Sequence, residues 1–165
     1  MAVQSISTLD MKAVVQRVLS ARVTIRETGD VRSINRGLMV LLGVSGTDTS
    51  ADARYLADKI TSLRIFNDAD GNMNLGFTDL PDPQMLVVSQ FTLYGDTRKG
   101  RRPSFVAAAP GSVAEPLYRE FVSMIREAGI KAETGEFGAD MLVDIANDGP
   151  VTLIVESITK ATQSA

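Results

Sequence analysis

The chain has 165 residues, a length typical of one globular domain that can bury a substantial hydrophobic core. Its mean hydropathy is near zero, and no apolar run approaches the roughly 20 residues that a membrane-spanning helix needs. The sequence contains no cysteine and no histidine, which excludes disulfides, thiolate nucleophiles and histidine-dependent catalytic triads. Any catalysis must therefore rely on carboxylates, hydroxyls, backbone dipoles or the substrate itself.

The net charge of −3 argues against sequence-independent coating of nucleic acid. One local exception is the segment Arg98–Arg102, here called the basic loop, whose charges lie on Arg98, Lys99, Arg101 and Arg102. Such a loop can contact phosphate groups, although an isolated run of charge is more often a solvated surface loop. Its position shortly after the polar segment described below favours the functional interpretation.

In chain order, the first third alternates short apolar runs with turn residues, a pattern typical of strands. The expected strands are Met11–Val18, Arg22–Glu27, Val31–Ile34 and Leu38–Val44. A hairpin turn at Thr28–Asp30 should join the second and third of them. Thr49 and Asp52 resemble a capping box, and an apolar stripe predicts a helix from about Ser50 to Leu63.

The middle of the chain combines turns, one buried strand and a second helix. The turn Asn67–Asn72 hints at a calcium loop, but Phe66 and Phe77 would occupy its first and last ligand positions and cannot coordinate a metal. Met85–Val88 predicts a buried strand. Ser112 and Glu115 resemble a capping box that opens a helix from about Val113 to Ala128.

The last third is predicted to form strand Met141–Ala146, a turn at Asn147–Pro150 and strand Val151–Ser157. Together the elements predict a mixed α/β fold, in which a curved, barrel-like mixed β-sheet carries two main helices in a single domain. That domain should span residues 11–157. Residues 1–10 are expected to be a disordered N-terminal extension without a signal peptide, and residues 158–165 a C-terminal tail, which makes the cytoplasm the expected location.

The segment Ser89–Tyr94, here called the strand-end segment, is the strongest indication of function. It begins where the apolar run Met85–Val88 gives way to hydroxyls and an amide. A buried strand that becomes polar at its carboxyl end is where α/β folds often place chemistry. The alternative is that these side chains only satisfy backbone groups at the strand end.

The strand-end segment resembles the signature of the D-aminoacyl-tRNA deacylase family. Further segments resemble the same family, in the same order along the chain: Val14–Val18, Asn72–Leu75, Asp96–Phe105, Thr134–Met141 and Asn147–Thr152. The resemblance extends from about Met11 to Ser157. It implies a two-fold homodimer that hydrolyses the ester bond of D-aminoacyl-tRNA and also that of mischarged glycyl-tRNA. The resemblance implies no metal or other cofactor and no association with a membrane.

The resemblance also assigns roles to residues. Ser89, Gln90, Phe91 and Thr92 would line the reacting centre, with backbone N–H groups near Phe91 and Thr92 stabilising the oxyanion. Because a threonine nucleophile usually needs an adjacent base, we expect the terminal ribose 2′-OH to help activate water instead. The resemblance further implies that the Gly149-Pro150 bond is cis, and that its carbonyls point into the partner subunit's active site and exclude L-residues.

Three more residues complete the candidate site. Phe137 would stack on the terminal adenine, and Met141 would line the adenosine pocket, although both fit plain core packing. Arg17 lies in an apolar strand and needs a partner; the resemblance suggests that it helps to hold the Gly-Pro loop of the other subunit. The basic loop would contact tRNA phosphates.

Two other interpretations remain open from the sequence. One is a non-catalytic nucleic-acid-binding module that uses the basic loop and Phe137. The other is a structural homodimer, in which Gly149→Ala and Gln90→Ala would affect stability more than turnover.

Overall fold

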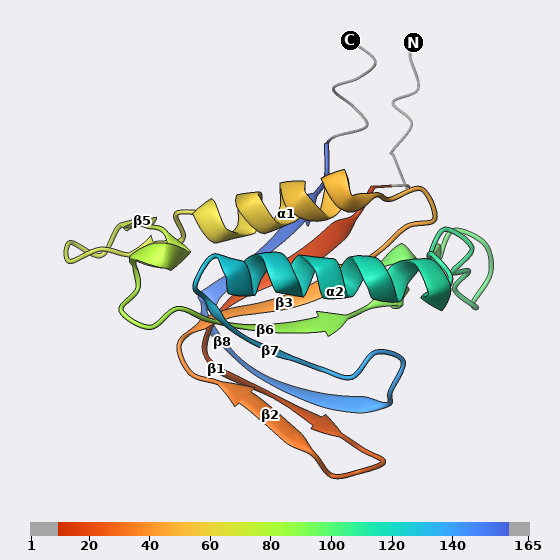
Figure 1. Cartoon of the computed structure of the whole chain (residues 1–165), viewed down its shortest axis with the longest axis horizontal. Helices are drawn as coiled ribbons and strands as arrows, with labels where there is room; N and C mark the ends of the chain where they lie inside the picture. Colours follow the sequence, from red (N-terminus) through yellow and green to blue (C-terminus); the bar gives the residue numbers. More distant parts are fainter. Residues whose placement is uncertain (1–9, 159–165) are drawn as a thin grey trace.

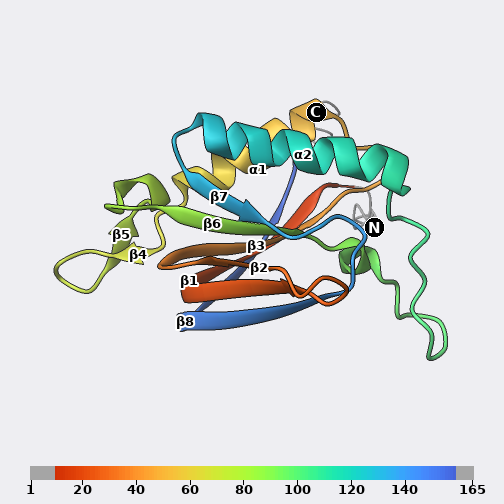
Figure 2. The same cartoon turned by 60° about the horizontal axis from the view of Figure 1, so that its bottom comes forward.

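The computed structural model describes residues 10–158 (Figure 1). Most of the predicted N-terminal extension and C-terminal tail therefore lies outside the described residues. A curved sheet forms one layer and two helices lie side by side across it (Figures 1 and 2). The elements are β1 (Lys12–Ile25), β2 (Val31–Ile34), β3 (Gly37–Gly43), α1 (Ser50–Ser62), β4 (Phe66–Asn67), β5 (Met73–Leu75), η1 (Phe77–Asp79), β6 (Gln84–Ser89), η2 (Phe91–Tyr94), α2 (Gly111–Glu127), β7 (Lys131–Thr134) and β8 (Met141–Glu156).

The long strand β1 organises the sheet. Its first half pairs antiparallel with β3, its second half pairs antiparallel with β2, and β8 runs antiparallel along its other edge. Beyond β3, the strands β6 and β7 continue the sheet in parallel. The mixed sheet therefore curves into a nearly closed barrel, which confirms the predicted fold class.

The last third of the chain corrects one prediction. Residues 141–156 form one strand, not two strands joined by a hairpin turn. In the ladder with β1, Asn147 pairs with Val18 and Thr152 pairs with Gln16, so the residues between them bulge out opposite Arg17. Both halves of β8 pair with the same strand, so the turn-forming residues produce a bulge and the chain does not reverse. Likewise, β1 is one strand that pairs with β8 along its length, where two strands, Met11–Val18 and Arg22–Glu27, were expected.

The two helices agree with prediction in position but differ in how they begin. At α1, the backbone N–H of Thr49 donates to the Asp52 carboxylate at 2.9 Å, as a capping box requires. At α2, the predicted capping box is wrong: the helix begins at Gly111, and the Pro110 carbonyl accepts hydrogen bonds from the N–H groups of Val113 and Ala114. In residues 10–158, no helix is both long and apolar enough to cross a membrane.

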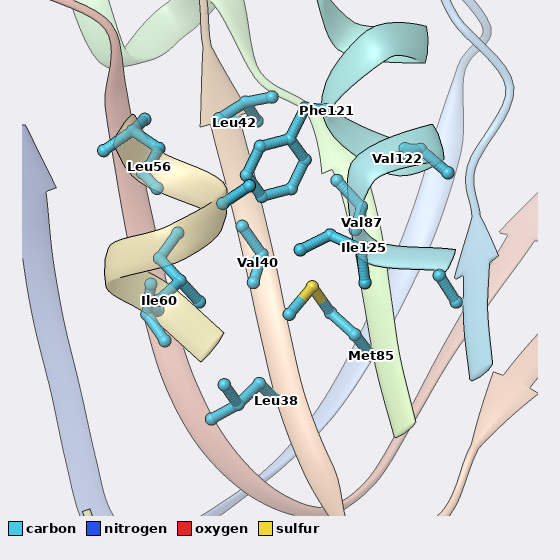
Figure 3. Packing of buried hydrophobic residues seen from close by; sticks show 14 of the residues in the cluster. Leu38, Val40, Leu42, Leu56, Ile60, Met85, Val87, Phe121, Val122 and Ile125 are labelled. Carbon is cyan, nitrogen blue, oxygen red and sulfur yellow. The ribbon is translucent and has the colours of Figure 1, made fainter. Parts of the chain in front are cut away.

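The strand β6 lies between two hydrophobic cores. Met85 and Val87 point toward the helices, where they meet Phe121 and Ile125 (Figure 3). Leu86 and Val88 point the other way, into the barrel. Since successive side chains of a strand face opposite sides, both faces of β6 are buried, which explains its unbroken apolar run. The polar residues from Ser89 onward therefore continue from a strand that is packed on both faces.

Candidate active site

The strand-end segment starts at the carboxyl end of two parallel strands. Ser89 pairs with Leu42 of β3, and the N–H of Gln90 donates to the Leu42 carbonyl at 2.8 Å. After Gln90 the chain turns into the short helix η2. Ser89 is half-buried, whereas the Phe91 side chain is 56% exposed. The segment thus passes from the core to the surface within a few residues.

The far end of the segment is anchored by Tyr94. Its hydroxyl donates to the carbonyls of Asp10, at 2.6 Å, and Gly43, at 3.1 Å. Burial raises the pKa of this phenol, so it stays a neutral donor. A Cβ atom at Gly43 would lie 2.9 Å from the Tyr94 ring, so glycine allows η2 to pack directly on β3. Both ends of the segment are therefore fixed to β3.

A pocket of about 410 Å³ opens beside the segment, between the ends of the strands and the start of α2. It brings together five of the sequence-predicted residues: Ser89, Gln90, Phe91, Phe137 and Met141. Its wall also includes Val44, Val88, Ala109, Gly111, Ala114, Gly138, Ala139, Asp140 and Val143. We call it the strand-end pocket. It combines an apolar wall with a few polar groups, as small-molecule sites usually do.

Thr92 lies next to this pocket rather than in its wall. The Gln90 side-chain amide donates a hydrogen bond to the Thr92 hydroxyl. The hydroxyl therefore faces an amide and not a basic group, and the sequence holds no histidine. This arrangement suits a positioning role better than nucleophilic attack, because a threonine nucleophile needs a base beside it.

Phe137 and Met141 enter the pocket from the connection between β7 and β8. The Phe137 ring leans on Tyr118 of α2, with a centroid separation of 6.1 Å and an interplanar angle of 47°. It is only half-buried. Partly exposed aromatic side chains in a pocket wall can stack on planar ligands, as they do on unpaired bases.

The basic loop is exposed and lies next to the strand-end segment. Asp96 and Ser104 close it through a pair of backbone hydrogen bonds. The ring of Phe105 contacts the ring of Phe91 edge-on, with a centroid separation of 5.2 Å. Arg98 forms an ion pair with Asp96 at 2.8 Å, and its hydrogen bonds hold the pKa of that carboxyl well below its usual value. The charge of Lys99 also lowers the pKa of Asp96, and within the described part of the chain Arg101 and Arg102 form no ion pair with a carboxylate.

The Gly149-Pro150 peptide bond is cis, and the pair lies exposed on the bulge of β8. It does not line the strand-end pocket of its own chain. Arg17 is 7% exposed and donates to the carbonyls of Asp148, at 3.2 Å, and Ile65, at 2.8 Å. Its Nε also lies 3.5 Å from the Asp148 carboxylate. Arg17 therefore has the partners that a buried arginine needs, and they belong to its own chain. Its expected contact with the Gly-Pro loop of the other subunit stays a prediction.

Pocket residues that carry no reactive group were not predicted from the sequence. Ala109, Gly111 and Ala114 form the helix side of the wall, where small side chains leave space for a ligand. The run of small residues before α2 was a signal that could have found them. Within residues 10–158, no three histidine, cysteine or carboxylate side chains gather closely enough to hold a metal ion.

Comparison with known proteins gives consistent matches. The family model described as D-Tyr-tRNA(Tyr) deacylase matches residues 14–156. A D-aminoacyl-tRNA deacylase from Desulfatibacillum aliphaticivorans is 61% identical over 147 residues, which cover 89% of this chain and 99% of that relative. A D-aminoacyl-tRNA deacylase from Clostridium botulinum is 56% identical, and the match covers 89% of this chain and 97% of that relative.

Two solved structures share the fold. One, described as c-Myc DNA unwinding element binding protein, is 41% identical with a TM-score of 0.80, and the match covers 88% of this chain and 98% of that one. The other, a probable eukaryotic D-amino acid tRNA deacylase, is 18% identical with a TM-score of 0.79, over 89% of this chain and 99% of its own. At that identity the second match supports the fold alone.

Fold, pocket and relatives together define an enzyme of the hydrolase class. Its strand-end segment lies at the pocket, and the matched region includes every element that builds the pocket wall. The chain belongs to the D-Tyr-tRNA(Tyr) deacylase family.

Proposed function

We propose that this enzyme hydrolyses the ester bond between a D-amino acid and the 3′-terminal adenosine of tRNA, releasing free D-amino acid and tRNA. Mischarged glycyl-tRNA is a second substrate, and L-aminoacyl-tRNA is rejected. The reaction takes place in the cytoplasm, where charged tRNA is used. The observation that carries the proposal is the strand-end pocket, which unites Ser89, Gln90 and Phe91 with Phe137 and Met141.

In this pocket the adenine stacks on Phe137, and the ester lies over the strand-end segment. Water adds to the ester carbonyl, the resulting oxyanion accepts hydrogen bonds from backbone N–H groups near Phe91 and Thr92, and the ribose oxygen leaves with a proton. The ribose 2′-OH helps to activate the water, because the chain contains no histidine to act as a base. The protein contributes mainly by positioning these groups.

Chirality is read by the Gly149-Pro150 pair of a partner subunit. Its two carbonyls accept hydrogen bonds from the substrate ammonium group, so an L side chain would collide with the backbone while a D side chain points to open space. Glycine has no side chain and escapes this exclusion. The pair's exposure and its absence from the pocket of its own chain support an action across a two-fold dimer. Arg17 binds the carbonyl of Asp148, the residue before the pair, in its own subunit, and in the dimer it also helps to hold the incoming Gly-Pro loop of the other subunit.

The surface of β8 supports such a dimer. Among the described strands, β8 pairs with β1 alone, so its outer edge is open. Apolar side chains are exposed on and beside it: Ile154 is 72% exposed, Leu19 59% and Leu142 46%. Open edges and exposed apolar side chains are features that association with another chain covers.

The test compares hydrolysis of D-Tyr-tRNA, L-Tyr-tRNA and glycyl-tRNA by the purified protein with a chelator present. Loss of the D-ester and the glycyl ester, with the L-ester intact, is the expected result. A folded dimer that hydrolyses none of the three would refute the proposal. Thr92→Ala should keep most of the activity if Thr92 only positions groups, whereas a loss of several orders of magnitude would make it the nucleophile.

A non-catalytic nucleic-acid-binding role is the second candidate. It is favoured by the exposed basic loop and by the 41% identical structure described as a DNA element binding protein. The net charge of −3 counts against it. The same assay separates the two roles, because a binding module retains tRNA without releasing the amino acid.

A further inference from the structure

A second pocket, of about 360 Å³, lies farther along α2. Its wall comes from one side of α2, the end of β7 with the three residues that follow it, and one side chain of β2. We call it the arginine pocket, because Arg32, Arg119 and Arg126 line it together with Glu136 as the one carboxylate of the wall. The deacylase mechanism above uses none of these four residues.

The three guanidinium groups are held in place by defined contacts. Arg32 donates from β2 to the carbonyls of Thr134 and Gly135, both at 3.0 Å. Arg126 donates to the Ala132 carbonyl at 2.9 Å. These bonds to the backbone of β7 and its end hold both side chains in place. Arg32 also forms an ion pair with the Asp30 carboxylate at 3.1 Å, whereas Arg126 forms no ion pair within the described residues.

The third guanidinium group, that of Arg119, pairs with Glu115 one turn earlier on α2, at 2.8 Å. This pair is largely exposed and therefore weak, so an incoming anion can compete for the guanidinium. Within residues 10–158, the Nη1 groups of Arg119 and Arg126 make no hydrogen bond. Since an arginine has five N–H donors, both side chains keep capacity for a ligand.

All three arginines act on one buried group, which indicates that they converge. Burial raises the pKa of the Tyr118 phenol to about 12, while the positive charges of Arg32, Arg126 and Arg119 act in the opposite direction. Tyr118 lies in the wall of the arginine pocket and donates to the Val87 carbonyl at 2.7 Å. The three guanidinium groups therefore lie around a neutral hydroxyl.

The arginine pocket adjoins the strand-end pocket. Phe137 belongs to both walls, and α2 runs past both, with Gly111 and Ala114 at one and Tyr118 to Arg126 at the other. At 1.5 Å per helical residue, the stretch from Gly111 to Arg126 measures roughly 22 Å. A ligand bound at Phe137 thus has the three arginines of this pocket nearby.

We infer that the arginine pocket binds the phosphate groups of the nucleotides that precede the terminal adenosine of the substrate RNA. This inference rests on the proposed function, because it assumes that the adenosine stacks on Phe137. Guanidinium groups bind phosphate oxygens in the bidentate geometry that lysine cannot provide. A single strand that leaves the strand-end pocket past Phe137 reaches these arginines directly, whereas the basic loop lies beyond Phe91, at the other end.

The test measures kcat/KM for D-Tyr-tRNA and for the D-tyrosyl ester of adenosine, which lacks the preceding phosphates. In the double variant Arg119→Gln/Arg126→Gln, kcat/KM for D-Tyr-tRNA divided by kcat/KM for the adenosine ester should fall roughly tenfold. Only the longer substrate forms charge-assisted hydrogen bonds with these side chains. The slope of log(kcat/KM) for tRNA against log salt should also become shallower by about 0.7 for each phosphate that the variant no longer binds. A purely structural role of Arg126 would not move that slope.

Three controls make the result decisive. Arg54→Gln removes one positive charge from an exposed position on α1 and should leave both the ratio and the slope near their wild-type values. Arg119→Gln alone breaks no bond to the backbone, so it reports on the pocket even if the double variant folds poorly. Arg126→Lys keeps the charge and should restore most of the salt slope.

A wild-type ratio and salt slope in both Arg119→Gln and the double variant would overturn the inference while leaving the deacylase function intact. If the wild-type enzyme hydrolyses neither ester, the proposed function fails instead. Binding of uncharged tRNA, followed by fluorescence anisotropy, then tests the pocket by itself. Weaker binding with a shallower salt slope in the variants supports phosphate recognition, and unchanged binding refutes it.

Discussion

Gly149→Ala tests how the exposed Gly-Pro pair is held. Gly149 has φ +117°, a backbone conformation that residues with a side chain rarely adopt. A Cβ atom there would lie 2.8 Å from Nη2 of Arg17 and 3.0 Å from Cγ2 of Val151. The substitution therefore strains the backbone and pushes against the guanidinium that binds the neighbouring Asp148.

The expected cost follows from these two effects. A side chain in a sparsely populated φ region costs on the order of 1–3 kcal/mol. Displacing Arg17 weakens its hydrogen bonds and adds about 1 kcal/mol. Together they lower the free energy of unfolding by about 2–4 kcal/mol, which corresponds to a fall in Tm of roughly 4–16 °C for a chain of this size.

Thermal unfolding by circular dichroism measures this effect, and Gly29→Ala is the matched control. Gly29 has φ +75°, but a Cβ atom there would meet nothing within 4 Å, so the control carries backbone strain without a collision. Its fall in Tm should be clearly smaller. If Gly149→Ala melts at the wild-type temperature, the argument from φ and the Arg17 contact is wrong. Turnover of the D-ester, assayed well below Tm, should also fall if the pair serves the active site; unchanged turnover would favour a purely structural role.

Three further predictions follow from the described contacts. Arg17→Met leaves the Ile65 carbonyl without this donor and breaks the ion pair with Asp148, so urea denaturation should show a loss of about 2–3 kcal/mol; a loss below about 0.5 kcal/mol would contradict the contacts. Because the folded state raises the Tyr118 pKa from its ordinary value near 10 to about 12, its contribution to stability is complete below pH 10 and is lost as pH rises toward 12. Tyr118→Phe should remove that part of the alkaline decline, and an unchanged pH dependence of unfolding would refute the assignment. Since no histidine is present, kcat/KM should be flat from about pH 5 to 7, and a fall near pH 8 should disappear with an ester substrate that lacks the amino group; a transition that persists with that substrate would contradict this reasoning.

The sequence was most informative where local pattern and burial agree. The apolar run before Ser89 identified β6, because a strand buried on both faces must be continuously apolar. The change to polar residues at Ser89 then located the pocket. The helix α1 was predicted nearly residue by residue, since its apolar stripe and the Thr49–Asp52 cap both depend on residues close in sequence.

Features that depend on distant partners could not be predicted in the same way. Asn147–Pro150 has the composition of a hairpin turn, and only its pairing on both sides with β1 makes it a bulge. Likewise, Ala109, Gly111 and Ala114 carry no chemical signal, and their role depends on the position of α2 opposite Phe137. Arg17 clearly needed a partner, but its position in the fold determined that Asp148 and Ile65 supply it.

The pairing of β1 with β8 also has a consequence for how the protein forms. Arg17 and Asn147, which lie beside each other in that ladder, are 130 positions apart in the chain. On the ribosome, the first strand is thus synthesised long before the strand that covers its outer edge. Such non-local pairing makes folding slow and leaves apolar strand edges exposed to aggregation while synthesis continues. A nascent chain that stops before Met141 would lack β8 entirely, so the barrel is completed only once Glu156 has been synthesised.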